Sequence, residues 1–331
     1  MRQLPVIDLT ALRTPCGDTS DVARLIDQAC RQSGFFLVTG HGIDPQLADD
    51  LDKTSRIFFA LPESDKSLIA MEHGGTAWRG WFAIADEVTS GVPDQKEGLY
   101  FGTELNAFDP RVRNALPLHG ANLFPTHPAE MKNLVLRWMD EVTALGRDLL
   151  RGIALGLGIE GDWFNSHLTA DPTILFRIFA YPPLGDLGWG VGEHTDYGLL
   201  TMLWQDDCGG LEVFSENRWL PVEPIPNTFV CNIGDMLERL TNGLYRSTPH
   251  RVRNISGRTR LSLPLFYDPS WTARVIPLPI ETPLQQLDAP KRWDGADLLA
   301  WSGSYGDYLT SKVSKAFPKL EADILRSNRD S

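Results

Sequence analysis

The most informative segment of the sequence is Glu193-His194-Thr195-Asp196-Tyr197-Gly198. In an extended chain, residues two apart project from the same face roughly 7 Å apart, so the imidazole of His194 and the carboxylate of Asp196 can bind one ion. A third ligand is available at His250, because Pro249 favours an extended conformation of the residue before it and a strand-like run follows. The spacing therefore predicts a three-ligand metal site on β-strands.

A second motif, Arg260-Leu261-Ser262, begins ten residues after His250. Arg260 and Ser262 share one face of a strand, and a guanidinium beside a hydroxyl suits the binding of a carboxylate. Each motif alone is weak evidence, since a chain with seven histidines can contain His-x-Asp by chance. Their order along the chain is specific. Two histidines and one carboxylate with open coordination positions are typical of non-haem Fe(II) oxygenases.

The regions around these motifs differ in their periodicity. Short strand-like runs separated by turn residues occupy 174–181, 199–204, 211–214, 219–222, 228–233, 250–252 and 260–267. Their spacing indicates a β-sandwich or β-barrel. The apolar pattern predicts helices from Ser20, from Asp44-Pro45, from Pro128 and over 293–317, and a strand over 35–39. The sequence therefore predicts helices packed around a β core.

Composition limits the function classes. Hydrophobic residues make up 42% and charged residues 22% of the 331 residues, as in ordinary globular proteins. The net charge of −12 argues against binding to nucleic acid or to an anionic membrane. No signal-peptide pattern, long apolar run or Cys-x-x-Cys pair is present. We expect a cytoplasmic protein, monomeric or weakly homo-oligomeric, that acts on a small molecule.

The motifs closely resemble the isopenicillin N synthase-like family of Fe(II)- and 2-oxoglutarate-dependent oxygenases. The resemblance covers nearly the whole chain and includes Leu4-Pro5-Val6-Ile7-Asp8, Gly40-His41-Gly42-Ile43, Tyr181-Pro182-Pro183, Asn232-Ile233-Gly234-Asp235 and Pro249-His250-Arg251-Val252. It implies an α+β fold whose core is a double-stranded β-helix (jelly-roll, cupin-like) wrapped by N-terminal and C-terminal helices. We expect one domain over 1–331, with an N-terminal α/β region (1–128), a long supporting helix (129–158), the jelly-roll core with the metal site (172–270) and a C-terminal extension (271–331).

The resemblance also implies roles for single residues. His194, Asp196 and His250 would bind Fe(II), Arg260 and Ser262 would bind the distal carboxylate of 2-oxoglutarate, and Tyr181 would add a hydrogen bond to it. Many relatives carry asparagine two residues before that tyrosine, where this chain has Phe179. The implied cofactors are Fe(II), 2-oxoglutarate and O2, with ascorbate as a reductant.

The implied reaction oxidises an unactivated C–H bond of a small molecule, by hydroxylation, desaturation or cyclisation, and releases succinate and CO2. Two alternatives stay open. The first is an Fe(II) oxidase of the same fold that does not consume 2-oxoglutarate, and the second is a jelly roll that binds metal and ligand without turnover. The Arg-x-Ser motif does not separate the first alternative from the main interpretation.

The candidate substrate contacts come mostly from the segment 74–102, which should border the pocket. They are Arg79, Trp81, Phe82, Glu87, Thr89 and Tyr100, with Tyr197 beside the metal and Arg177 on the strand that leads to Tyr181. If Arg177 points inward it is a buried cation that requires an anion, from substrate, co-substrate or Glu87. The glycine-rich segment 185–192 has the composition of a mobile flap.

Overall fold

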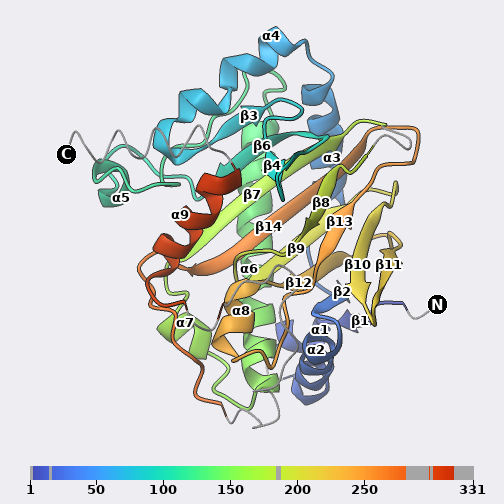
Figure 1. Cartoon of the computed structure of the whole chain (residues 1–331), viewed down its shortest axis with the longest axis vertical. Coiled ribbons are helices and arrows are strands. Elements are labelled where there is room, and N and C mark those ends of the chain that lie inside the picture. Colours follow the sequence, from blue (N-terminus) through green and yellow to red (C-terminus); the bar gives the residue numbers. More distant parts are fainter. Residues whose placement is uncertain (1–2, 15–16, 184–187, 281–297, 299–300, 317–331) are drawn as a thin grey trace.

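A computed structural model of the chain describes residues 3–14, 17–183, 188–280, 298 and 301–316. Two β-sheets form its centre (Figure 1). The larger sheet has the order β1 (Val6–Asp8), β2 (Phe35–Thr39), β12 (Phe229–Ile233), β9 (Leu200–Gln205), β14 (Arg260–Ser270), β7 (Pro172–Tyr181), β6 (Glu97–Gly102) and β3 (Gly80–Phe82). The smaller sheet has the order β11 (Arg218–Val222), β10 (Leu211–Ser215), β13 (His250–Val252) and β8 (Val191–His194). The predicted α+β fold with a jelly-roll core is confirmed.

The longest helix covers the face of the larger sheet that is turned away from the smaller one (Figure 1). This helix, α6 (Met131–Gly156), passes behind the larger sheet and packs on β14 and β9 (Figure 1). Gly146 allows this close approach, because a Cβ atom there would lie 2.6 Å from the Tyr267 ring. The other helices are α1 (Thr10–Arg13), α2 (Ser20–Gln32), α3 (Pro45–Phe59), α4 (Glu63–Lys66), α5 (Pro110–Arg113), α7 (Trp163–His167), α8 (Asp235–Leu240) and α9 (Tyr305–Ala316). The helices predicted from Ser20, Asp44-Pro45 and Pro128 are therefore present.

The N-terminal region contributes strands to the core sheet. The sequence predicted the strand over 35–39 but not its place in this sheet. β1 pairs in parallel with β2, and β2 pairs antiparallel with β12. At the other edge β6 pairs with β7, and β3 with β6. A two-stranded hairpin of β4 (Val88–Thr89) and β5 (Val92–Pro93) completes the strands, and 67–69 and 71–77 form short 3-10 turns. Strands of the N-terminal region and strands of the jelly-roll core therefore build one sheet.

The C-terminal helix is shorter than predicted. Of the expected helix over 293–317, residues 293–297, 299–300 and 317 lie outside the described residues. The helix α9 begins at Tyr305, because the Ser304 hydroxyl accepts a hydrogen bond from the Asp307 backbone N–H and donates one to the Asp307 carboxylate. No described helix is long and apolar enough to cross a membrane.

Strand alternation positions the site between the two sheets. On β7, four alternate residues, Leu175, Arg177, Phe179 and Tyr181, line a cavity of about 480 Å³, whereas Phe176 and Ile178 pack into the main core. The same alternation places Arg260 and Ser262 of β14 on the cavity wall. Residues of β8 and β13 line the cavity from the smaller sheet. One cavity is therefore bordered by both sheets of the jelly roll.

Candidate metal and co-substrate site

Three side chains with metal-ligating atoms meet where β8 and β13 pair. These strands are antiparallel with His194 opposite His250, and Asp196 follows two residues after the end of β8. Oδ1 of Asp196 lies 3.9 Å from Nε2 of His194 and 3.6 Å from Nε2 of His250. One ligand atom from each of the three residues lies within 4.8 Å of the others, an arrangement that could hold a metal ion.

Hydrogen bonds orient each of these side chains. Nδ1 of His194 lies 2.8 Å from the Gly192 carbonyl oxygen, and Nδ1 of His250 lies 3.2 Å from the Thr248 carbonyl oxygen. A carbonyl oxygen accepts a hydrogen bond only from a protonated Nδ1, so the geometry assigns the lone pair to Nε2, the atom that faces the shared position. The three ligands are thus prearranged to bind one divalent ion.

The two carboxylate oxygens of Asp196 have different partners. Its Oδ2 accepts hydrogen bonds from Oγ1 of Thr201 at 2.5 Å and from Nδ2 of Asn232 at 2.7 Å. Its Oδ1 remains directed toward the two histidines. Sequence reasoning missed the roles of Thr201 and Asn232, because they lie on β9 and β12 and only the fold brings them to Asp196.

The charges of the cluster also suit a metal. Burial lowers the pKa of His250 to about 4, and the neighbouring His194 adds to this effect, so His250 is a neutral imidazole at pH 7. Burial acts to raise the pKa of Asp196, but His250, His194 and its two hydrogen-bond donors outweigh it and lower that pKa. A neutral histidine and an ionised carboxylate are the forms that bind metal.

Arg260 is fully buried and incompletely paired. Its Nε donates to the Gly209 carbonyl at 2.6 Å, and its Nη2 donates to Oε1 of Gln205 at 3.1 Å. Its Nη1 has no hydrogen-bond partner among the described residues. Leaving such a group unpaired is costly, so the site is suited to an incoming anion. The residues present therefore fit the distal carboxylate of 2-oxoglutarate.

Ser262 and Tyr181 lie beside this guanidinium. The Ser262 hydroxyl is 3.5 Å from the Tyr181 hydroxyl, and Cζ of Arg260 is 4.9 Å from the centre of the Tyr181 ring. Arg260 and Tyr181 are direct partners in the pairing of β14 with β7. The structure thus brings together the three residues that were expected to hold the co-substrate, on the wall of the same cavity as the candidate metal ligands.

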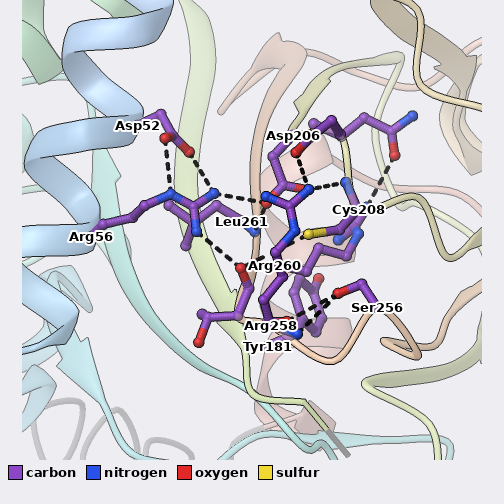
Figure 2. A network of polar contacts seen from close by, with 12 residues as sticks. Asp52, Arg56, Tyr181, Asp206, Cys208, Ser256, Arg258, Arg260 and Leu261 are labelled. Carbon is purple, nitrogen blue, oxygen red and sulfur yellow. Dashed lines mark hydrogen bonds and ion pairs between the residues drawn. The ribbon is translucent and has the colours of Figure 1, made fainter. Parts of the chain in front are cut away.

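A network of polar contacts links Arg260 to the turn between β9 and β10 and to α3 (Figure 2). Asp206 lies in the turn between β9 and β10, where its Oδ2 accepts from the Leu261 backbone N–H at 2.7 Å and from Nη2 of Arg56 at 2.8 Å. Its Oδ1 accepts from the Cys208 backbone N–H at 3.0 Å. This turn presents the Gly209 carbonyl to Arg260, so α3, which carries Arg56, supports the orientation of the guanidinium.

The acidic pair in this turn also lies close to Cys208, in a second group of potential metal ligands formed by Asp206, Asp207 and Cys208. Ion pairs account for both carboxylates, because Asp206 pairs with Arg56 and Asp207 with Arg258.

The candidate substrate residues divide into two groups. Five line the cavity: Arg177, Tyr197, Glu87, Thr89 and Tyr100. Three are not among its lining residues: Arg79, Trp81 and Phe82. Arg79 instead donates to the Leu118 carbonyl, and the Trp81 indole donates to Glu97. These three residues lie outside the cavity because Trp81 and Phe82 belong to β3, the edge strand beyond β6, and Arg79 directly precedes it. The glycine-rich and proline-rich sequence did not reveal this position.

Sequence reasoning also missed a buried lysine in the cavity wall. Lys96 forms ion pairs with Glu87, at 2.7 Å, and with Asp94. It lies 4.8 Å from the centre of the Phe179 ring. An isolated lysine in a loop-like segment carries no signal of burial in the sequence. Of the proposed flap over 185–192, residues 185–187 lie outside the described residues.

Comparisons with known proteins agree with this geometry. Residues 4–127 match the family model described as the non-haem dioxygenase in morphine synthesis N-terminal, and residues 171–269 match the 2OG-Fe(II) oxygenase superfamily. A "probable iron/ascorbate oxidoreductase" of Dictyostelium discoideum is 45% identical over 98% of each chain. A homoarginine-6-hydroxylase of Oryza sativa subsp. japonica is 36% identical over 96% of this chain and 98% of its own.

Solved structures show the same likeness. A full-length protein of Neurospora crassa, solved in complex with alpha-KG (2-oxoglutarate), has a TM-score of 0.76 and 26% identity, over 94% of this chain and 96% of its own.

Proposed function

Because the chain belongs to the 2OG-Fe(II) oxygenase superfamily, we propose that it hydroxylates an unactivated C–H bond of a small molecule, with the metal held by His194, Asp196 and His250. Fe(II) and 2-oxoglutarate are the cofactors typical of this family. In the balanced reaction, R–H, O2 and 2-oxoglutarate give R–OH, succinate and CO2, so one oxygen atom enters each organic product. Bound Fe(II) supplies the site at which O2 is reduced.

One observation carries this proposal: the three-ligand cluster and the unpaired Nη1 of Arg260 belong to the same cavity. Arg260, with Ser262 and Tyr181 beside it, holds the distal carboxylate of 2-oxoglutarate, and the opposite end of the co-substrate then faces the metal ligands. A planar guanidinium suits a carboxylate because it can donate two parallel hydrogen bonds. The chain's own contribution is to orient both reactants and to exclude water from them.

The test is aerobic turnover with Fe(II), 2-oxoglutarate and a panel of small molecules. We expect succinate to form in a ratio of one to one with hydroxylated product. Hydroxylation is favoured over desaturation or cyclisation because one relative is a named hydroxylase. Substrate oxidation without succinate would contradict the proposal and support the oxidase.

That second candidate, an Fe(II) oxidase that takes its electrons from ascorbate, is favoured by the name of the Dictyostelium discoideum relative. Product formation that requires ascorbate but proceeds without 2-oxoglutarate would identify it. Ascorbate would otherwise act only to keep the metal reduced.

We further propose a single domain that acts in the cytoplasm as a monomer or weak homo-oligomer, without nucleic-acid or membrane partners. The pairing of β2 with β12 supports the single domain, because it joins the N-terminal region to the core sheet. The net charge of −12 supports the exclusion of anionic partners.

A further inference from the structure

Besides Arg260, two buried cations line the cavity, and they differ in their counter-ions. Lys96 forms ion pairs with two carboxylates, those of Glu87 and Asp94. Arg177, whose exposure is 8%, has no carboxylate within ion-pair distance among the described residues. Its Nη1 donates to the carbonyls of Phe101 and Phe176, at 3.1 Å each. Among the described residues, carboxylates therefore form ion pairs with Lys96 and not with Arg177.

The nearest acidic side chains already have partners. Glu87 accepts a hydrogen bond from the Tyr100 hydroxyl at 2.5 Å through Oε1 and pairs with Lys96 through Oε2. Asp268 accepts from the Tyr305 hydroxyl at 2.5 Å and from the Leu199 backbone N–H at 3.2 Å. Both carboxylates therefore make their printed contacts with groups other than Arg177. Burial lowers the pKa of Arg177, and the nearby Tyr100 and Glu87 offset only part of this effect.

The guanidinium is also held in place. Its Cζ lies 3.5 Å from the centre of the Tyr100 ring, so the ring covers one side of the group. Such stacking is favourable for arginine and leaves the edges of the planar group for hydrogen bonds. Together with the two carbonyl acceptors, this contact prearranges a cation in the cavity wall.

The position of Arg177 separates it from the co-substrate site. Arg177 and Tyr181 lie on the same face of β7, four residues apart, which is about 13 Å along a strand. Tyr181 is the residue paired with Arg260. Phe179 lies between the two positions and Leu175 lies beyond Arg177, so apolar side chains flank Arg177 along the strand. An anion at Arg177 is therefore a second anion, distinct from the one at Arg260.

We propose that Arg177 binds a carboxylate of the substrate, so the oxygenase acts on a small organic acid whose apolar part contacts Phe179 and Leu175. This inference rests on the proposed function and names the substrate class for the same site. Arg177 binds and orients the substrate and takes no part in electron transfer. A bidentate contact between a guanidinium and a carboxylate fixes direction as well as affinity, which determines the C–H bond that faces the metal.

The test compares acids with their uncharged amides. The Fe(II)-loaded protein, with saturating 2-oxoglutarate and without O2, is titrated calorimetrically with phenylacetate and phenylacetamide, and with hexanoate and hexanamide. We expect at least one acid to bind about tenfold or more tightly than its amide, as a charged hydrogen-bonded pair predicts. In Arg177→Gln the preference should disappear through weaker binding of the acid, and Arg177→Lys should restore part of it.

Lys315→Gln is the matched control, because Lys315 is an exposed cation that also lines the cavity. This variant should keep the preference for the acid. Equal binding of acid and amide by the unsubstituted protein, in both pairs, would overturn the inference. So would a preference that survives in Arg177→Gln or is lost in Lys315→Gln. The visible band of the Fe(II)–2-oxoglutarate chelate in the same samples reports separately on the proposed function.

Discussion

Single hydrogen-bond donors orient Asp196, the candidate metal ligand that follows the end of β8. One carboxylate oxygen faces the histidines, and the other accepts hydrogen bonds from Thr201 and Asn232. Without these donors the carboxylate could rotate and present either oxygen. The two donors come from different strands of the larger sheet, so the metal site depends on correct pairing of both sheets.

Asn232→Ala tests this orientation without removing a ligand. We expect metal affinity to fall about 10- to 100-fold, the usual effect of losing such a support. Calorimetric titration with Mn(II), which is stable in air, measures it. Asn165→Ala, on the exposed face of α7, is the control and should bind as the parent protein does. An unchanged affinity for Mn(II) in Asn232→Ala would show that Asp196 is oriented without the Asn232 side chain.

Arg260→Lys tests the co-substrate site. A lysine ammonium lacks the spaced, planar donors of a guanidinium, so it cannot reproduce the contacts of Nε with Gly209 and of Nη2 with Gln205 and also donate two parallel hydrogen bonds to a carboxylate. The KM for 2-oxoglutarate should rise about tenfold or more, with a smaller change in kcat, in succinate assays at varied 2-oxoglutarate. An unaltered KM would remove Arg260 from its assigned role.

At the scale of elements, the turn between β9 and β10 joins α3 to Arg260 through Asp206. Arg56→Ala removes the ion pair that holds Asp206 from the outside. We expect a rise of a few fold in the KM for 2-oxoglutarate at constant kcat, because the Gly209 carbonyl becomes less well positioned. Arg137→Ala on α6, which removes a similar ion pair with Glu141, should leave the KM unchanged. Equal effects in the two variants would indicate a general loss of stability.

The helix α9 is attached to the core by buried tyrosine–carboxylate pairs. Tyr305 donates to Asp268, and Tyr308 donates to Asp235 at 2.9 Å. Through these contacts α9 places Leu309, Lys312 and Val313 in the cavity wall. Burial raises the pKa of Asp268 to about 7, although its hydrogen bonds with Tyr305 and Leu199 oppose the rise.

This raised pKa predicts how the free energy of unfolding depends on pH. Between about pH 4 and 7 the folded protein keeps a proton on Asp268 that the unfolded chain has lost, so this group makes stability fall as pH rises through that range. Above pH 7 its effect is constant. Asp268→Asn carries no such proton, so its free energy of unfolding relative to the parent should increase from pH 5 to pH 7.5. Urea denaturation of the metal-free proteins measures this difference, and a constant difference would contradict the raised pKa.

At the scale of the whole molecule, the larger sheet joins segments that are distant in the sequence. Its order runs from the N-terminal β1 and β2 through β12, β9, β14 and β7 to β6 and β3 (Figure 1). The cavity is therefore walled by strands of the core, by the segment 87–100 and by α9. All three parts of the chain therefore contribute side chains to the cavity wall.

Much of the site could be predicted because its ligands occur in short motifs. His194 and Asp196 are two residues apart, and Arg260 follows His250 closely on the next strand. The long helix was predictable from its apolar stripe. The strand pairing at the sheet edges was not, because β2 joins β12 and β6 joins β7, partners far away in the sequence. For the same reason the burial of Lys96 and the position of Arg79 needed the structure.

The central claim is that the metal ligands and Arg260 form one site for Fe(II) and 2-oxoglutarate. The most direct measurement is anaerobic addition of Fe(II) and then 2-oxoglutarate, followed by visible absorption. We predict that the charge-transfer band of an Fe(II)–2-oxoglutarate chelate appears in the parent protein and is absent from His194→Ala and Asp196→Ala. A parent protein that binds Fe(II) but gives no such band at saturating 2-oxoglutarate would contradict the account.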